Sequence, residues 1–190
     1  MANMAGKLYY VIGPSGSGKD TLIDAVRVQY PDDLIVAHRY ITRSADSGGE
    51  NHVALTVEEF GSRRDKGLFA LYWQAHGLEY GIGQEVMEWL AKGFSVVVNG
   101  SRAELSQARR CFGAQLIPVV IQVEQGVLRQ RLVDRARETE QDIERRLARA
   151  AQYTLPQTQE LCVIDNSGNI EHSVQQFSLL RAEFESGETA

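Results

Sequence analysis

The sequence predicts an α/β protein in which helices cover both faces of a parallel sheet. Short apolar runs rich in β-branched residues alternate with segments of helical periodicity along most of the chain. Runs of this kind are typical of parallel strands that are buried on both faces. A Gly-rich turn joins the first apolar run directly to the first helical segment. The 190 residues suffice for one domain with a substantial core of its own.

Five apolar runs are predicted as the strands of the parallel sheet. They cover residues 8–12, 34–40, 95–99, 116–123 and 161–164. Segments with helical periodicity are predicted as helices. They cover residues 19–29, 84–92, 101–111, 126–153 with a break near residues 138–139, and 170–184. Tyr30-Pro31 ends the first of these helices, and Gly93 ends the second.

Residues 41–83 interrupt this alternation with polar, Gly-rich sequence. Thr56 and Glu59 have the spacing of a capping box, which predicts a short helix after Thr56. Residues 69–74 and 78–80 flank the dipeptide His76-Gly77 and are predicted as the strands of a hairpin. We expect a substrate-binding insertion here, because the segment departs from the regular order of strands and helices.

Composition argues against several classes of protein. The net charge of −5 is unlike that of a general nucleic-acid binder or of a protein that binds acidic membranes. No apolar run approaches the ~20 residues of a membrane span, so we expect a cytoplasmic protein with no membrane partner. Cys111 and Cys162 are expected to be reduced thiols, and the four histidines show no zinc-type clustering.

The strongest functional motif is a phosphate-binding loop. It follows the first predicted strand directly and opens the first helix, with the residues Gly13, Pro14, Ser15, Gly16, Ser17, Gly18 and Lys19. Glycines let the backbone curl until several N–H groups point inward, and the helix N-terminus adds partial positive charge. Lys19 can reach the β- and γ-phosphates. The motif therefore predicts binding of a nucleoside triphosphate, and ATP is the expected cofactor.

Asp20 and Thr21 follow the lysine of the loop, at the point where a Ser or Thr usually binds Mg²⁺. A carboxylate is a good ligand for a hard cation. We therefore expect Mg²⁺ at Asp20, directly or through water, or at Thr21 in its place. The alternative is that Asp20 is only an acidic residue in the first turn of the helix.

Seven arginines gather in the predicted helical segment of residues 126–153, beside several acidic side chains. They are Arg129, Arg131, Arg135, Arg137, Arg145, Arg146 and Arg149. Most such residues form ion pairs on a solvated helix face. A phosphotransferase, however, needs cations on the transferring phosphoryl group, and an arginine-bearing lid supplies them while it excludes water.

The order of these motifs resembles that of guanylate kinases. The shared motifs are the phosphate loop, Thr42-Arg43, Tyr80-Gly81 and the arginine-rich sequence from Arg131 to Leu147. The resemblance covers nearly the whole chain and implies a P-loop NTPase fold with a five-stranded parallel sheet. It implies one kinase domain that comprises a core of residues 6–40, 84–125 and 154–185, an acceptor-binding insertion of residues 41–83 and a lid of residues 126–153.

The resemblance also implies roles for single residues. Arg43 and Tyr80 would hold the phosphate of the acceptor, and Asn166 would lie near the adenine. The residues that would act in catalysis are Lys19 and Asp20 of the loop and the lid arginines Arg135, Arg137 and Arg146.

Three positions depart from the guanylate kinase pattern. Asp46 stands where a second arginine is expected, Leu71 aligns with the glutamate that reads guanine, and Ser101 aligns with an expected aspartate. Loss of these polar groups should remove guanine specificity. The chain more closely resembles the ribose 1,5-bisphosphate phosphokinases of phosphonate breakdown, in Asp20 and in residues 49–52, 73–77 and 98–102. That resemblance implies transfer of the γ-phosphoryl group of ATP to the 1-phosphate of ribose 1,5-bisphosphate, giving 5-phosphoribosyl 1-diphosphate and ADP.

A bisphosphorylated sugar has two anionic ends, so its site needs two cationic anchors. Arg43 and Tyr80 can serve one end, and Arg102 with His52 or His76 can serve the other. Candidates for contacts with the ribose are Asn51, Gln74 and Asn99, and Ser101 is a further candidate for binding the substrate. The alternative for His76 is that it only forms the turn of the hairpin. The alternative for Trp73 is that it packs in the core rather than against the substrate.

Two other functions stay open at the level of sequence. The chain could be a nucleoside-monophosphate kinase with altered base specificity, or a binding module that has lost catalysis. Lys19 and the arginines of residues 126–153 argue against the second alternative. A monomer or a homodimer is expected.

Overall fold

A computed structural model describes residues 6–47, 50–134, 139–151 and 161–185. It confirms the predicted α/β class. Five parallel strands form the central sheet in the order β2-β7-β1-β8-β9. Their bounds are Leu34–Ala37 for β2, Ser95–Asn99 for β7, Leu8–Ile12 for β1, Leu116–Gln122 for β8 and Cys162–Asp165 for β9. β1 lies at the centre of the sheet and carries the Gly-rich loop at its carboxyl end.

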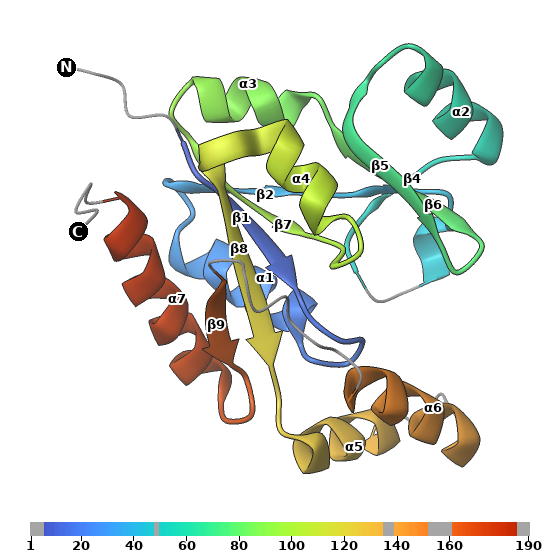
Figure 1. Cartoon of the computed structure of the whole chain (residues 1–190), viewed down its shortest axis with the longest axis vertical. Helices are drawn as coiled ribbons and strands as arrows, with labels where there is room; N and C mark the ends of the chain where they lie inside the picture. Colours follow the sequence, from blue (N-terminus) through green and yellow to red (C-terminus); the bar gives the residue numbers. More distant parts are fainter. Residues whose placement is uncertain (1–5, 48–49, 135–138, 152–160, 186–190) are drawn as a thin grey trace.

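Helices cover both faces of this sheet (Figure 1). Helices α1 and α7 pack on the face that bears Tyr9 and Val11 of β1, and helices α3 and α4 pack on the face that bears Leu8, Tyr10 and Ile12. Every side chain of β1 is buried, because alternate residues point to two covered faces. The bounds are Lys19–Gln29 for α1, Glu85–Ala91 for α3, Leu105–Phe112 for α4 and Ile170–Glu185 for α7.

A second sheet of four strands stands beside the first, in the order β4-β3-β6-β5 (Figure 1). Its strands are β3 (Tyr40–Ile41), β4 (Val53–Ala54), β5 (Phe69–Ala75) and β6 (Leu78–Gly83), and α2 (Val57–Asp65) precedes β5. As predicted, Thr56 caps α2, and its hydroxyl oxygen accepts a hydrogen bond of 3.1 Å from the N–H of Glu59. Most of this unit lies within the predicted insertion of residues 41–83.

The predicted hairpin is confirmed, and both of its strands extend further than expected. His76 and Gly77 form its two-residue turn with φ angles of 52° and 75°. Positive φ at both central positions is the geometry of a type I′ turn, whose twist matches that of the flanking strands. The turn fixes the register, so that Trp73 and Tyr80 are direct cross-strand partners on one face.

Two further predicted boundaries were wrong by three or more residues. The run predicted as one strand over residues 34–40 ends at Ala37, and Tyr40 already belongs to the second sheet. The chain changes sheets at residues 38–39, and the apolar pattern does not reveal this change. The helix predicted from residue 101 begins at Leu105, because the N–H groups of Glu104 and Leu105 bond to the carbonyl oxygens of Ser101 and Arg102 in a tight turn.

Helices α5 (Gln125–Asp134) and α6 (Glu140–Ala151) follow β8 and flank the predicted break. They pack on each other through a small apolar cluster that is separate from the core of the sheet: Leu128, Leu132, Ile143 and Leu147. β1, β8 and β9 point with their carboxyl ends toward this helix pair (Figure 1). The pair occupies the segment predicted as a lid, and movement of this segment stays a prediction.

Helix α7 closes one face of the sheet. The rings of Phe177 and Tyr9 meet edge to face with centroids 5.1 Å apart. Burial, followed by the nearby carboxylate of Glu185, raises the pKa of Tyr9, so its hydroxyl stays neutral at physiological pH. Neither Cys111 nor Cys162 forms a disulfide bond within the described ranges. No helix within the described ranges combines the length and the apolar character needed to cross a membrane.

Candidate functional site

The turn after β1 has the geometry of a phosphate-binding loop. Gly16 and Gly18 adopt φ angles of 90° and 87°, a left-handed region that favours glycine. A Cβ atom on Gly18 would lie 2.4 Å from Nδ2 of Asn166, so close packing also requires glycine there. Gly18 precedes α1 without a side-chain cap. The first N–H groups of α1 can therefore bind an anion, and the helix dipole favours one at this point.

Asn166 supports the loop from behind. The residue follows β9 and is 3% exposed. Its Nδ2 donates to the carbonyl oxygen of Ser17 at 2.7 Å, and Oγ of Ser173 donates to its Oδ1 at 2.8 Å. Both ends of the amide are thus engaged within the protein, which ties the loop to β9 and α7. The predicted position of Asn166 near the adenine stays a prediction.

Two cations reach the loop from different elements. The Nζ atom of Lys19 donates to the carbonyl oxygens of Gly13 at 2.9 Å and Pro14 at 3.0 Å. The Nη1 atom of Arg146, on α6, donates to Oγ of Ser15 at 2.8 Å. Helix α6 therefore already contacts the loop through one of the predicted arginines. Arg135 and Arg137, the other two, lie outside the described residues.

Asp20 is held by Asn99, which ends β7. The Nδ2 atom of Asn99 donates to Oδ1 of Asp20 at 2.8 Å. A carboxylate can only accept, so the amide nitrogen must face Asp20 and the amide oxygen must face away. This Oδ1 atom of Asn99 is buried and has no hydrogen-bond partner among the residues that the structure describes. Buried polar atoms are normally paired, so its position next to the loop indicates a missing donor.

The residues beside Lys19 suit a magnesium ion bound mainly by phosphates. In the ranges that the structure describes, no three His, Cys, Asp or Glu side chains come together as a metal site. Mg²⁺ in kinases commonly uses one or two carboxylates and completes its shell with water and phosphate oxygens. The carboxylate of Asp20 and the hydroxyl of Thr21 line the same cavity and supply oxygen donors of this kind.

A central cavity of about 400 Å³ opens between the loop, the second sheet and the turn after β7. It brings together most of the residues that the sequence predicted for the acceptor: Arg43, His76, Tyr80, Asn99, Ser101 and Arg102. Lys19, Asp20 and Thr21 line its other side. The cavity therefore joins the predicted nucleotide site to the predicted acceptor site, as transfer between two bound substrates requires.

Three predicted acceptor residues, Asn51, His52 and Gln74, do not line this cavity. Asn51 is exposed. His52 lies behind Arg43: its Nε2 lies 3.2 Å from the carbonyl oxygen of Arg43, and its Nδ1 lies 3.2 Å from Nη2 of Arg43. It can position that arginine. Gln74 is exposed on the outer face of β5, where its amide nitrogen lies 3.5 Å from Oε1 of Glu79. Alternation along the strand turns Trp73 inward and Gln74 outward.

Arg39 and Glu50 line the central cavity and were missed by the sequence analysis. They form a two-point ion pair in which Nε of Arg39 lies 2.6 Å from Oε1 of Glu50. The side chains are only 11% and 12% exposed. An arginine inside an apolar run was the signal that could have revealed this site, because a charge there is costly unless it is paired.

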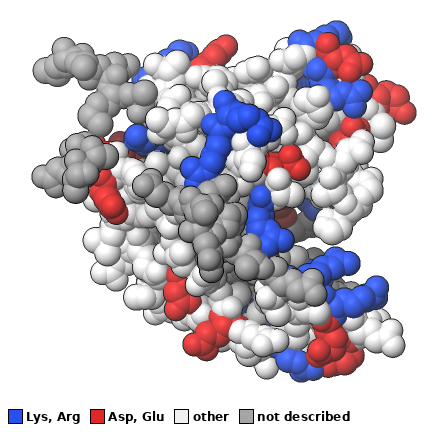
Figure 2. Space-filling model, in the orientation of Figure 1, with Lys and Arg blue, Asp and Glu red and all other residues white. Residues whose placement is uncertain are grey.

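An arginine cavity of about 510 Å³ adjoins the central cavity on the side of α6. It is lined by Ser15 of the loop, the hairpin residue His76, Arg102, and Arg146 and Arg149 of α6. Figure 2 shows blue side chains on both sides of a hollow between the second sheet and the α5–α6 pair. Cations from two separate units of the fold thus face the phosphate loop.

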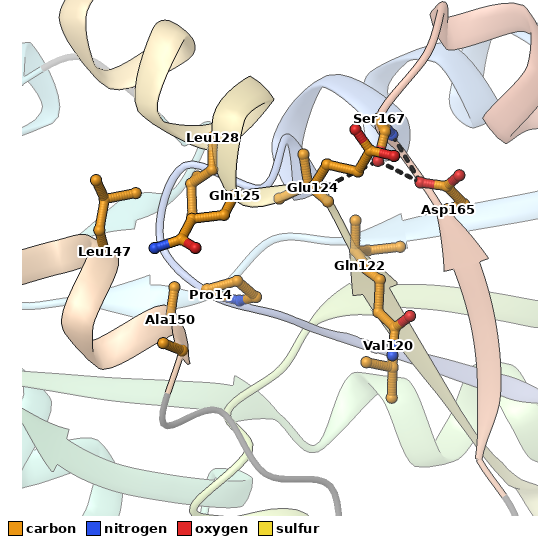
Figure 3. Close-up of a pocket in the computed structure, with 13 residues that line it drawn as sticks. Pro14, Val120, Gln122, Glu124, Gln125, Leu128, Leu147, Ala150, Asp165 and Ser167 are labelled. Carbon is orange, nitrogen blue, oxygen red and sulfur yellow. Dashed lines mark hydrogen bonds between the residues drawn. The ribbon is translucent and has the colours of Figure 1, made fainter.

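Two further cavities flank the loop. The Arg131 cavity, of about 290 Å³, is lined by Gly18, Thr21, Arg131 and Asn166 among others. Within the described part of the chain, the buried Nη1 atom of Arg131 has no hydrogen-bond partner. The Pro14 cavity, of about 410 Å³, lies under α5 and α6, and Leu128 and Ala150 border it (Figure 3).

The Pro14 cavity is poorly suited to phosphate. Its ionisable lining residues, Glu124 and Asp165, are both acidic. Hydrogen bonds from Ser167 lower the pKa of Asp165, so this carboxylate is ionised at neutral pH and repels an anion. Phosphate groups at the loop can therefore extend into the central cavity, the arginine cavity or the Arg131 cavity.

Comparison with known proteins gives a consistent result. The guanylate kinase family matches residues 5–180. Ribose 1,5-bisphosphate phosphokinase PhnN of Pantoea vagans is 55% identical over 170 residues, which is 90% of this chain and 94% of the relative. The enzyme of the same name from Enterobacter lignolyticus is 51% identical over 174 residues, covering 92% of this chain and 90% of the relative.

Solved structures agree on the fold. The guanylate kinase of Anaplasma phagocytophilum superposes with a TM-score of 0.65 at 18% identity, over 95% of this chain and 87% of that one. A gluconokinase from Sinorhizobium meliloti gives a TM-score of 0.53 at 16% identity, over 98% of this chain and 99% of that one.

Proposed function

The chain belongs to the guanylate kinase family, and we propose that it is an ATP-dependent kinase that acts on ribose 1,5-bisphosphate. The observation that carries the proposal is its identity of 51% and 55%, over about nine-tenths of its length, to relatives that bear the name of this activity. The reaction converts ATP and ribose 1,5-bisphosphate into ADP and 5-phosphoribosyl 1-diphosphate.

In this proposal the loop from Gly13 to Thr21 binds the phosphates of ATP. The nucleoside part extends into the Arg131 cavity, where Arg131 and the adjacent Asn166 lie beside the loop. Asp20 and Thr21 would hold Mg²⁺, which would neutralise charge on the triphosphate when bound. Asn99 keeps the carboxylate of Asp20 directed toward the cavity.

The acceptor would occupy the central cavity with its two phosphates at different cations. Arg43 and Tyr80 would hold one phosphate from the second sheet. Arg102 and His76, which line both the central and the arginine cavity, would hold the other. Ser101 and the buried amide oxygen of Asn99, which bonds to no described residue, are suited to ribose hydroxyl groups.

The chemistry needs positioning and charge neutralisation more than proton transfer. A phosphate monoester is largely ionised at pH 7, since its second pKa is about 6. An oxygen of the 1-phosphate attacks the γ-phosphorus of ATP, and the bond from that phosphorus to the bridging oxygen breaks. ADP leaves with the electron pair. Lys19 and Arg146 at the loop, with Arg135 and Arg137, would stabilise the charge on the transferring group.

A direct assay tests the proposal. The purified protein is incubated with ATP, Mg²⁺ and ribose 1,5-bisphosphate, and the products are followed by phosphorus NMR. Equal amounts of ADP and 5-phosphoribosyl 1-diphosphate are expected. Faster turnover of GMP or another nucleoside monophosphate than of the sugar bisphosphate would contradict the proposed acceptor.

A further inference from the structure

The aromatic face of the central cavity is covered by side chains of the protein itself. Trp73 and Tyr80 oppose each other on β5 and β6, and their rings stack with centroids 5.5 Å apart and planes 6° apart. The guanidinium carbon of Arg39 lies 5.8 Å from the centroid of Trp73 and 5.1 Å from that of Tyr80. These contacts occupy the planar surface on which a nucleobase would stack.

Glu50 fixes the guanidinium in this place. It binds Arg39 through two parallel hydrogen bonds, an arrangement that sets the plane of the guanidinium as well as its position. Both side chains are close to nine-tenths buried. Burial of an ion pair carries a desolvation cost, and the contact with the two rings offsets part of it. The pair therefore covers the rings as part of the cavity wall.

The rest of the cavity suits phosphate and hydroxyl groups. It presents the cations Lys19, Arg43 and Arg102, and the side chains of Asn99 and Ser101. Leu71, which aligns with the guanine-reading glutamate of guanylate kinases, is only 1% exposed and packs in the core. The cavity thus offers neither an open aromatic face nor an acidic side chain at that position to read a base edge.

We propose that the Arg39–Glu50 pair determines acceptor specificity. By covering Trp73 and Tyr80 it excludes a nucleobase and leaves the cavity to a small phosphorylated sugar. The inference rests on the proposed function, because it concerns the acceptor of that reaction.

The test removes the pair without leaving a lone buried charge. In the double variant Arg39→Ala/Glu50→Ala, the ratio of kcat/KM for ribose 1,5-bisphosphate to kcat/KM for GMP should fall by about tenfold or more, the scale at which pocket shape discriminates between substrates. Affinity for GMP alone, measured by calorimetry, should rise, and this readout does not depend on catalysis.

The double variant Arg63→Ala/Glu59→Ala is the matched control. Arg63 also pairs with a glutamate, at 2.8 Å, and also lies over a tyrosine ring, with its guanidinium carbon 5.3 Å from the centroid of Tyr40. It belongs to α2 and does not line the central cavity. In this control variant, the ratio of kcat/KM for ribose 1,5-bisphosphate to kcat/KM for GMP should match that of the wild type.

A second double variant distinguishes the effect of covering the two rings from the effect of the charges. It also provides a test if the alanine variant does not fold. Arg39→Met/Glu50→Gln keeps side-chain volume over the rings, so it should retain the wild-type preference for ribose 1,5-bisphosphate and the weak binding of GMP.

The possible outcomes distinguish the inference from the proposed function. If the alanine variant folds and its kcat/KM ratio and GMP affinity are unchanged, the inference is overturned while the proposed function stands. If the alanine variant does not fold, the Arg39→Met/Glu50→Gln variant decides. Tighter binding of GMP by this variant than by the wild type overturns the inference. Wild-type protein that prefers GMP to the sugar bisphosphate overturns the proposed function itself.

Discussion

Two opposite charges stand next to each other in the phosphate loop, and the fold directs them to different partners. Lys19 reaches back over the loop to the carbonyl oxygens of Gly13 and Pro14. Asp20 reaches across to Asn99 at the end of β7. The two side chains are therefore bonded to different parts of the protein, and each can act on a different part of a bound triphosphate.

Lys19→Ala tests the cation of the loop. Because this ammonium would stabilise charge on the phosphoryl groups, kcat should fall by about a thousandfold or more, the range known for cations at phosphoryl-transfer sites. Steady-state kinetics with ATP gives the rate, and circular dichroism checks the fold. A rate close to that of the wild type would mean that the loop has been assigned the wrong role.

Asp20→Asn and Asn99→Ala test the proposed metal ligand and the residue that positions it. Both should raise the Mg²⁺ concentration for half-maximal activity, and loss of the positioning residue should cost about tenfold in metal affinity. Electron paramagnetic resonance of Mn²⁺ with the protein and ADP measures that affinity without turnover. Unchanged Mn²⁺ binding in both variants would exclude Asp20 from the metal shell.

At the scale of elements, α5 and α6 form a unit with a core of its own. Leu128 and Leu132 meet Ile143 and Leu147 in a cluster separate from the two clusters of the central sheet. Arg146 links this unit to the loop through Ser15. A unit held by few apolar contacts can open at low cost while the sheet stays intact, as a lid must.

Leu147→Ala should loosen this helix pair selectively. Leu147 is 4% exposed, and deletion of a buried leucine side chain costs about 2–5 kcal/mol. Amide hydrogen exchange should speed up in α5 and α6, while protection in β1 and β8 changes little, and kcat/KM for ATP should fall. Phe177→Ala, on α7, serves as the contrast, because it should weaken the core of the sheet. Equal loss of protection everywhere in the leucine variant would show that the helices do not open separately.

At the scale of the whole molecule, three units surround the phosphate loop. The central sheet supplies the loop and Asn99, the second sheet supplies Arg43 and Tyr80, and the α5–α6 pair supplies Arg146. Substrates that contact several units should hold them together, because a ligand stabilises the state that binds it.

Ligand binding should therefore raise the thermal midpoint. A non-hydrolysable ATP analogue with Mg²⁺, at a hundred times its Kd, should stabilise the protein by about 2.7 kcal/mol, and ribose 1,5-bisphosphate should add to the shift. Differential scanning fluorimetry measures the shift in thermal midpoint that each ligand causes. In Lys19→Ala, most of the shift caused by the nucleotide should be lost. A wild-type midpoint that does not respond to the nucleotide would favour a binding module without kinase activity.

The sequence by itself determined the central strands, the loop and the hairpin. β1, α1 and β7 have the predicted bounds, because an apolar run or a Gly-rich turn is a local pattern that depends on neighbours in the chain. The hairpin followed from His76-Gly77, whose backbone geometry is also local. The resemblance to known kinases added Arg43 and Tyr80.

The tertiary structure decided which side chains meet. Only the folded chain shows that Arg39 leaves the central sheet to stack on Trp73 and Tyr80. It also shows that Gln74 faces outward and that Asn99 meets Asp20, 79 positions away in the sequence. Local patterns specify backbone conformation, whereas contacts between distant side chains depend on how the two sheets pack around the loop. For this reason the loop was predictable and the wall of the acceptor cavity was not.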